Sequence, residues 1–462
     1  MKKRMDWHKL LSSDRLVSEV DTSGISVGRT PFEKDVDKVI FSGAFRRLNR
    51  KTQVHPIAAN DHIHTRLTHS LEVAQVGRAL GQSIGTRIAS ELPKGLTAYD
   101  IGSILQAACL AHDIGNPPFG HAGEEAMGHW FEANGPRIFR HLSKEHKHDL
   151  ETFEGNAQGF RILTQTENNL FRGGLNLTYA TLATFLKYPR TSRDPSRKFG
   201  AYITEEKILG QIAEHVGLIN INKHRWCRHP LAYLVEAADD ICYGILDLED
   251  AVELKILMFD DVEKILLKPF SKQEKEKIQN SYPTKKSYRI NLGRIRGPVF
   301  NFLISGAIDA FTNNYDRIMS GEAEQYIFDL LDADDPRRRL IAESKALTKN
   351  ETFQDSKKLE TELGSYATFE CLLETFCQAA LDVAQHLKSP KDEAPLIWRS
   401  VRVLQLLGDH APSEGNEPPG LPWSSYQCLR RVIDFTSGMT DNYATYIAKQ
   451  LQGMAFTGVQ RP

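Results

Sequence analysis

Three segments of the chain carry histidine and aspartate at positions that suit metal chemistry. His69 begins an amphipathic stretch, the adjacent pair His112 and Asp113 ends an apolar one, and Asp239 lies among apolar residues of a third. A carboxylate on the buried side of a helix is normally paired with a cation or bound to a metal. Two imidazoles and two carboxylates suit Mn²⁺, Fe²⁺, Co²⁺, Ni²⁺ or Mg²⁺ better than a structural zinc ion. We therefore predict a divalent metal site with these four ligands.

Two alternatives to this interpretation stay open at the level of sequence. His112 and Asp113 precede Ile-Gly-Asn-Pro-Pro, which stops a helix. They could therefore cap the end of that helix, where a protonated histidine interacts favourably with the helix dipole. Asp240 competes with Asp239 for the ligand role, although successive helix positions point about 100° apart.

The elements that must position these residues are helices. Apolar residues recur at helical spacing over 71–84, 101–110 and 231–248, whereas alternating apolar and polar runs are scarce. We therefore expect an all-α fold. The first of these stripes is made of Leu71, Val73, Val76, Leu80 and Ile84. The expected division of the chain is an N-terminal segment over 1–60, a core with the chemistry over 61–265 and a C-terminal helical region over 266–462.

The composition is that of an ordinary globular protein. The 462 residues include 58 Lys+Arg and 59 Asp+Glu, and 41% of residues are hydrophobic. These values exclude intrinsic disorder and give no general attraction to nucleic acid or to anionic membranes. None of the six cysteines forms a Cys-x-x-Cys pair, so neither a zinc ribbon nor a disulfide framework is indicated. Because we find neither a signal peptide pattern nor a spanning apolar run, we expect a cytoplasmic protein with no membrane partner.

Longer motifs surround the histidines and aspartates, and they occur along most of the chain. They are Phe45-Arg-Arg-Leu-Asn-Arg-Lys-Thr-Gln53-Val, His64-Thr-Arg66-Leu-Thr-His69-Ser, His112-Asp-Ile-Gly-Asn-Pro-Pro-Phe-Gly-His121-Ala-Gly-Glu124, Phe153-Glu-Gly-Asn-Ala-Gln158, Gly174-Leu-Asn-Leu-Thr178, Lys187-Tyr-Pro189, Glu236-Ala-Ala-Asp-Asp-Ile-Cys-Tyr243 and Gly438-Met-Thr-Asp-Asn-Tyr443. With these motifs the chain resembles the all-helical HD-domain metal-dependent phosphohydrolases, and within them the deoxyguanosine triphosphate triphosphohydrolase-like (dNTPase) branch. The resemblance covers residues from about 30 to 450.

The resemblance implies a reaction, a metal and a set of site residues. The reaction would be hydrolysis of a deoxynucleoside triphosphate, dGTP or another dNTP, to the deoxynucleoside and inorganic triphosphate. Mn²⁺ or Mg²⁺ would be the metal, and Co²⁺, Ni²⁺, Fe²⁺ and Zn²⁺ stay open. A homo-oligomer is implied as well. The implied roles are metal ligands for His69, His112, Asp113 and Asp239, an acid–base pair for His121 and Glu124, phosphate contacts for Arg66 and Lys187 with Tyr188 near them, and deoxyribose contacts for Gln53, Tyr243 and Asp247.

General chemistry supports several of these roles, and each has an alternative. His121 can titrate near neutral pH and Glu124 can orient it, but His121 could also be a loop histidine bonded to a carbonyl. Asp239, Tyr243 and Asp247 share one helical face at a spacing of four. A tyrosine ring against the 2′ carbon would exclude a 2′-hydroxyl, and the alternative for Tyr243 is plain core packing.

The phosphate contacts implied for Arg66 and Lys187 also have non-functional alternatives. Arg66 could pair with a surface carboxylate, which is usually worth little. Lys187 could belong to a solvated basic loop rather than contact phosphate.

Two other functions and two further partners stay open. The chain could be an HD-fold 5′-nucleotidase or phosphodiesterase acting on another nucleotide, or a nucleotide-binding or ssDNA-binding regulator with a weak active site. The segment 268–296 is strongly basic. It could be a solvated face, a groove for single-stranded DNA, or a site for an effector nucleotide between subunits.

Overall fold

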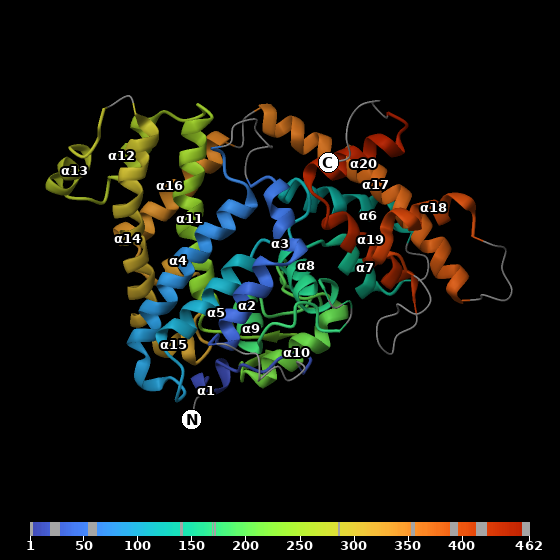
Figure 1. Cartoon of the computed structure of the whole chain (residues 1–462), viewed down its shortest axis with the longest axis horizontal. Helices are drawn as coiled ribbons and strands as arrows, with labels where there is room; N and C mark the ends of the chain where they lie inside the picture. Colours follow the sequence, from blue (N-terminus) through green and yellow to red (C-terminus); the bar gives the residue numbers. More distant parts are fainter. Residues whose placement is uncertain are drawn as a thin grey trace.

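The computed structural model describes residues 3–18, 28–53, 62–138, 142–168, 170, 172–284, 287–352, 356–388, 396–412 and 423–454. Within these residues the chain is helical apart from one small hairpin, which confirms the predicted all-α fold (Figure 1). The hairpin pairs β1 (Asn220–Asn222) with β2 (Arg225–Trp226) in antiparallel fashion. No described helix is both long enough and apolar enough to cross a membrane.

The α-helices of the described residues differ widely in length. Their bounds are α1 Trp7–Leu10, α2 Pro31–Ile40, α3 Gly43–Arg47, α4 Arg66–Arg87, α5 Ala98–Ala111, α6 His121–Ile138, α7 Lys144–Glu151, α8 Gly155–Arg161, α9 Tyr179–Phe185, α10 Glu206–His215, α11 Ala232–Glu253, α12 Phe259–Leu266, α13 Lys272–Gln279, α14 Tyr288–Asn313, α15 Tyr315–Met319, α16 Pro336–Thr352, α17 Ser356–Lys388, α18 Trp398–Leu407, α19 Ser425–Ser437 and α20 Asp441–Leu451.

The helices α4 and α5 pack very closely because glycines line their interface. A Cβ added at Gly81 would lie 2.8 Å from the carbonyl oxygen of Ile101 and 2.9 Å from the Cα of Gly102. One turn away on either side, a Cβ at Gly85 would lie 2.7 Å from the Cα of Ala98, and a Cβ at Gly77 would collide with the Sγ of Cys109. No larger side chain fits between two backbones at this distance. The glycines therefore set the separation between α4, which begins close to His69, and α5, which ends just before His112.

The ends of these two helices follow from local sequence. Thr65 caps α4, since its side chain accepts from the Thr68 N–H, and the Thr68 hydroxyl bonds the N–H of Thr65 in return. At the same end of the pair, α5 stops at His112, and the two prolines that follow Asn116 cannot continue a helix. Both imidazoles thus lie at helix ends rather than in helix interiors.

The helix α11 crosses α4 and is buried along most of its length. The stripe predicted over 231–248 is confirmed, because its six residues are all buried: Leu231, Val235, Ala238, Cys242, Ile245 and Leu248. The stripe predicted on α4 is confirmed for four residues and wrong for Leu71, which is 42% exposed. Leu71 lies two positions before Val73, about 200° around the helix, so it points away from the face that packs on α5.

The buried apolar side chains form two main clusters that lie side by side. One draws on residues from Met5 to Ile341, including α4, α5, α11 and α14. The other joins residues of 126–153, mainly from α6, to residues of 369–448 in the C-terminal helices α17 to α20. In Figure 1 the helices α12 to α14 lie at one edge of the molecule and α18 at the opposite edge. The expected division of the chain into three regions stays a prediction.

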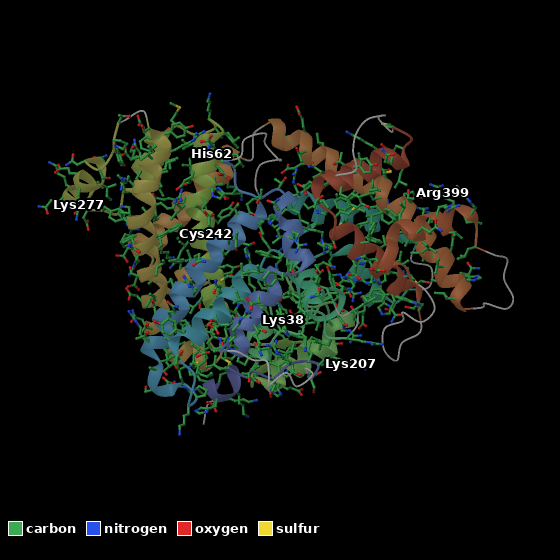
Figure 2. The ribbon with its side chains drawn as sticks, viewed as in Figure 1. Lys38, His62, Lys207, Cys242, Lys277 and Arg399 are labelled. Atoms are coloured by element: carbon green, nitrogen blue, oxygen red, sulfur yellow. The ribbon has the colours of Figure 1, made fainter. Side chains whose placement is uncertain are left out.

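The basic segment 268–296 forms α13 and the first part of α14. Lys277 on α13 projects at the edge of the molecule, whereas Cys242 on α11 lies inside it (Figure 2). Two arginines of α14 pair with carboxylates of α11, Arg289 with Glu253 and Arg296 with Glu249. Part of the positive charge of this segment is therefore neutralised within the chain. Lys285 and Lys286 lie outside the described residues.

The close contact between α4 and α5 predicts the effect of one methyl group. Gly81→Ala should lower the free energy of unfolding by about 1–3 kcal/mol, the usual cost of overpacking a tight interface. Gly293→Ala on α14 is the control, because a Cβ there meets nothing within 4 Å. This control should gain about 0.5–1 kcal/mol from the lost flexibility of glycine. Urea titration of both variants measures the difference, and equal stabilities would contradict the interpretation of the interface.

A buried histidine next to α11 predicts how stability depends on pH. His229 bonds the carbonyl of Leu10 through Nε2 and accepts the N–H of Leu231 at Nδ1, and burial lowers its pKa to about 4. The unfolded chain takes up this proton near pH 6.5, but the folded chain does so only near pH 4. The stability that His229 contributes is thus complete above pH 6.5 and is lost as the pH falls toward 4, by up to about 3 kcal/mol.

Unfolding free energies measured between pH 4 and 7 test this. His229→Gln should flatten the slope over that range, whereas His8→Gln at an exposed position should keep the slope of the unaltered protein. An unchanged slope in His229→Gln would show that another group is responsible.

Candidate metal centre and catalytic pocket

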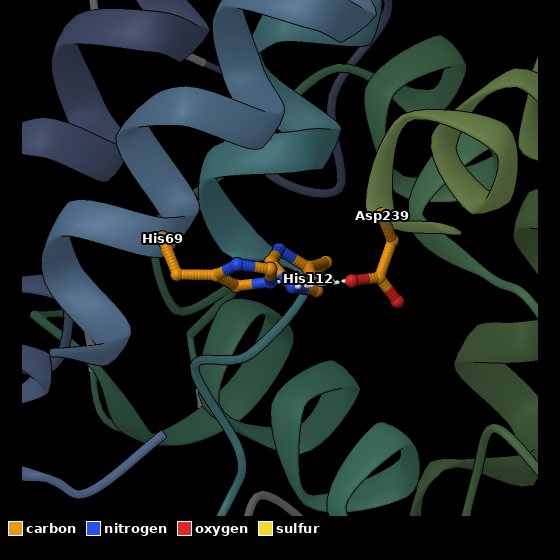
Figure 3. A group of neighbouring side chains, drawn as sticks. All are labelled: His69, His112 and Asp239. Carbon is orange, nitrogen blue, oxygen red and sulfur yellow. Dashed lines mark hydrogen bonds and ion pairs between the residues drawn. The ribbon is translucent and has the colours of Figure 1, made fainter. Parts of the chain in front are cut away.

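Three of the four predicted metal ligands converge from three helices. His69 lies in the first turn of α4, His112 at the end of α5 and Asp239 in the second turn of α11. His69 Nε2 lies 3.2 Å from Asp239 Oδ1, and His112 Nε2 lies 3.7 Å from the same oxygen. In Figure 3 the His69 and Asp239 side chains point toward each other from opposite helices. One ligand atom from each residue lies within 4.8 Å of the other two, a group that could hold a metal ion.

The ring of His112 is oriented for metal binding. Its Nδ1 lies 2.7 Å from the carbonyl oxygen of Cys109. Because a carbonyl only accepts, Nδ1 carries the proton and Nε2 presents its lone pair to the site. This Nε2 is buried and has no hydrogen-bond partner among the described residues. A buried acceptor that faces a carboxylate fits a bound cation, so the residues present suit the predicted metal.

The charges of the cluster depend on one another. Burial would lower the pKa of His69, but its hydrogen bond to Asp239 raises it above the ordinary value. Burial would raise the pKa of Asp239, but His69 and His112 hold it well below its usual range. The carboxylate is therefore ionised at neutral pH, as a metal ligand must be.

Asp113 lies beside this cluster and is engaged elsewhere. Its Oδ1 is 3.6 Å from His112 Nε2 and accepts from Asn116 at 2.5 Å. Its Oδ2 accepts from the Arg66 guanidinium at 2.7 Å. Burial opposes ionisation of this carboxyl, yet Arg66 and the two histidines lower its pKa to about 2. Asp113 is thus an ionised group at the edge of the cluster, and its ligand role stays a prediction.

The cluster opens into a cavity of about 510 Å³. Ten of the twelve predicted site residues line this cavity, and His69 and Asp247 do not. His69 lies behind the wall and is 1% exposed. The ten are Gln53, Arg66, His112, Asp113, His121, Glu124, Lys187, Tyr188, Asp239 and Tyr243.

His121 and Glu124 form a hydrogen-bonded pair at the start of α6. His121 is the first residue of the helix, its side chain is 84% exposed, and its Nδ1 lies 3.0 Å from Glu124 Oε2. The second Glu124 oxygen accepts the N–H of Gly155 at 2.9 Å, so the carboxylate is held from both sides. Since Nδ1 is occupied by Glu124, Nε2 is the ring nitrogen available to a substrate. This arrangement can move a proton.

Lys187 has a buried carboxylate as its partner. Its Nζ lies 3.1 Å from Oε1 of Glu236, which is 2% exposed and also pairs with Arg228 at 3.1 Å. Burial would lower the pKa of Lys187, but Glu236 raises it above the usual range. The ammonium group also lies 5.8 Å from the centre of the Tyr188 ring. The ammonium group of Lys187 therefore lies next to a carboxylate and a tyrosine ring at the cavity wall.

Two acidic residues of α11 lie outside the cluster. Asp240, the competitor to Asp239, pairs with Lys345 at 2.6 Å. Asp247 is buried, its Oδ2 has no hydrogen-bond partner among the described residues, and burial raises its pKa to about 8. Asp239 and Tyr243 line the cavity whereas Asp247 does not, and a contact of Asp247 with deoxyribose stays a prediction.

Several cavity residues had no predicted role. Glu236 belongs to one of the sequence motifs, and a carboxylate three positions before Asp239 on a buried helix was the signal that could have found it. Asn116 lies within another motif. Lys345 and Glu362 also line the cavity, and they come from α16 and α17. No local pattern marks these two.

Comparisons with known proteins show which family and which relatives the chain resembles. A family model described as "HD domain" matches residues 66–172. A "Deoxyguanosinetriphosphate triphosphohydrolase-like protein" of Pseudomonas aeruginosa is 45% identical over 457 residues, which cover 97% of this chain and 99% of that protein. A protein of the same description from Synechocystis sp. is 37% identical over 471 residues, covering 98% and 100%. A "Probable deoxyguanosinetriphosphate triphosphohydrolase" of P. aeruginosa is 30% identical over 473 residues, covering 89% and 91%.

The cluster geometry predicts that adjacent aspartates differ in metal binding. Asp239→Asn removes the charge of the carboxylate between the two imidazoles and should weaken binding of Mn²⁺ by more than about 100-fold, beyond the cost of losing an outer partner. Asp240→Asn is the matched control, because its carboxylate serves Lys345 and should leave the affinity within about twofold. Titration calorimetry with Mn²⁺ measures both, and a stronger loss in Asp240→Asn would reassign the ligand.

Proposed function

The chain belongs to the deoxyguanosinetriphosphate triphosphohydrolase-like family of HD-domain phosphohydrolases, and from this premise we propose that it hydrolyses deoxynucleoside triphosphates. The products would be a deoxynucleoside, from dGTP or another dNTP, and inorganic triphosphate. The observation that carries the proposal is one cavity into which the cluster of His69, His112 and Asp239 opens and which the His121–Glu124 pair lines. The relatives' printed names support the choice of substrate.

The chain's own residues supply most of what cleavage of the bond between Pα and O5′ requires. His69, His112 and Asp239, with Asp113 beside them, would hold the divalent ion, for which we propose Mn²⁺ or Mg²⁺. When bound, this ion supplies charge neutralisation at phosphate and a water of lowered pKa. Arg66 and Lys187 would hold phosphate oxygens.

His121 would move the proton in this reaction. Its Nε2–H would donate a proton to the 5′-oxygen that leaves, while the proton of the attacking water would pass to solvent, because the two oxygens lie on opposite sides of the phosphorus. Meanwhile the Nδ1–H would donate to Glu124, whose negative charge stabilises the imidazolium form. The hydrogen bond from Gly155 to the second oxygen of Glu124 supports this role, because it keeps the carboxylate in place while the charge changes.

The sugar would lie against α11 one turn from the metal ligand. Tyr243 follows Asp239 by four positions and lines the cavity, which supports packing of its ring against the 2′ carbon. A 2′-hydroxyl would then collide with the ring, so ribonucleotides would bind poorly. Gln53 lines the same cavity and would contact the sugar.

Four sequence-based expectations remain proposals beside this function. They are a homo-oligomer, an effector nucleotide, a single-stranded DNA partner and a cytoplasmic location. For the DNA partner, the pairing of Arg289 and Arg296 with carboxylates of α11 leaves less free charge in the basic segment than the sequence suggests.

Product identity tests the reaction and separates it from its alternatives. The protein, supplied with Mn²⁺ or Mg²⁺, is incubated with each dNTP singly and with the four together, and products are separated by ion exchange. We expect deoxynucleoside and intact triphosphate. Monophosphate and pyrophosphate would assign the cleavage to another bond, as in a phosphodiesterase. Absence of turnover under every condition would favour a binding protein.

The acid–base role of His121 predicts a second result. His121→Gln should lower kcat by about 10²–10⁴-fold with little change in KM, because the proton transfer is lost and binding is kept. His129→Gln is the matched control, since His129 is exposed on the same helix and lies outside the cavity lining. Steady-state kinetics measure both variants, and a His121→Gln enzyme of normal kcat would remove His121 from the mechanism.

A further inference from the structure

The turn between Asp113 and His121 has a conformation that its sequence does not favour. Phe119 adopts a φ of 63°, in the left-handed region, and Gly120 follows at 61°. For a residue other than glycine this conformation costs about 1–2 kcal/mol. A substitution at Gly120 would be strained because of this φ, and a Cβ there would lie 2.7 Å from the guanidinium of Arg66. The turn leads directly into His121, the first residue of α6. A contact that fixes the backbone of Phe119 therefore also fixes the position of His121.

One carboxylate from the C-terminal end of the chain holds this turn. Asp441 is the first residue of α20 and is 5% exposed. Its Oδ1 accepts the N–H of Phe119 at 3.1 Å. Its Oδ2 accepts both the N–H of Thr52, at 2.9 Å, and the Thr52 hydroxyl, at 2.6 Å. Phe119 and Thr52 both line the catalytic cavity, so each of these three hydrogen bonds of the Asp441 carboxylate ends on the cavity wall.

A buried lysine next to Thr52 completes the connection. Lys51 is 3% exposed, and its Nζ donates to the carbonyl of Asn116 at 2.6 Å and to the carbonyl of Ser437 at 2.7 Å. The Lys51 carbonyl in turn accepts the N–H of Arg66 at 3.3 Å. Asn116 is the residue whose amide bonds Asp113. The pair of Lys51 and Asp441 therefore ties the catalytic turn at two points to the C-terminal helices.

We propose that Asp441 and Lys51 are positioning residues for catalysis, which hold the turn 113–121 in its unfavourable conformation so that His121 and Asp113 face the substrate. This inference rests on the proposed function for its kinetic consequence, although the hold on the turn does not. Neither residue touches the reacting atoms. Their contacts make the C-terminal helices part of the active site.

The contact chemistry indicates which substitution tests the proposal. Asp441→Asn keeps the size of the side chain but replaces one acceptor oxygen by an NH₂ group. Three donors then meet one acceptor and a competing donor, so at least one contact to the turn or to Thr52 is lost. Thr445→Val on the same helix is the matched control, because among the described residues the Thr445 hydroxyl bonds only the backbone carbonyl of Asp441.

Kinetics and amide exchange are measured on the full-length protein with Mn²⁺. In Asp441→Asn we expect kcat for dNTP hydrolysis to fall about 10- to 100-fold, as misplaced catalytic groups do, while KM and the affinity for Mn²⁺ stay within about twofold. Peptides covering 114–124 should exchange their amide hydrogens faster, and peptides from α4 and α5 should not. Thr445→Val should match the unaltered protein in all of these measurements.

The other outcomes also decide the matter. Unchanged exchange in 114–124, or faster exchange with unchanged kcat, overturns the positioning role. A general loss of stability with kcat and Mn²⁺ binding falling together would overturn it too, because that result describes a structural residue. If Asp441→Asn does not fold, Lys51→Met is measured in the same way. If the unaltered protein hydrolyses no dNTP, the proposed function fails, and the exchange of 114–124 alone decides whether Asp441 holds the turn.

Discussion

The close approach of α4 and α5 is the constraint on which the rest of the structure depends. Side chains larger than hydrogen at Gly77, Gly81 and Gly85 would push the helices apart. At the present separation the rings of His69 and His112 lie 5.3 Å apart between centroids. Imidazoles at that distance can bind one ion together, and Asp239 of α11 completes the candidate group of three ligands. The metal chemistry is thus made possible by residues that have no side-chain chemistry.

Burial of charge is the second condition of the site, and it is met by pairing. Removing an ion from water costs several kcal/mol unless a partner compensates. Three basic side chains of the site each have a carboxylate close by, and the pairs are His69 with Asp239, Arg66 with Asp113, and Lys187 with Glu236. Groups arranged in this way need little reorganisation when a charged substrate enters, which is how a preformed polar site lowers a barrier.

Features that depend on local sequence, such as helices and helix ends, could be predicted. Features that depend on contacts between distant segments could not. Helical periodicity predicted the fold and the buried side of α11, and the helix-stopping prolines predicted that His112 lies at a helix end. Periodicity does not say which face meets a neighbour closely, so Leu71 was placed wrongly. The pairing of Arg66 with Asp113 and the contacts of Asp441 join segments far apart in the chain. The motif that contains Asp441 is recognisable in the sequence. The contacts of Asp441 with Phe119 and Thr52 can be seen only in the folded structure, where α20 lies against the turn 113–121.

The residues of the site are spread along the chain, which limits how the chain can be cut into fragments that keep the site. The HD family match ends at residue 172, whereas Asp239, Lys187 and Glu236 lie beyond that boundary. The helix that His121 begins takes its apolar cover from the C-terminal helices, not from α4 and α5. A recombinant fragment cut at the boundaries of the family match would expose this apolar face and lack the carboxylate that joins the two imidazoles. A fragment that keeps all of these site residues and the apolar cover of α6 therefore has to extend through α20.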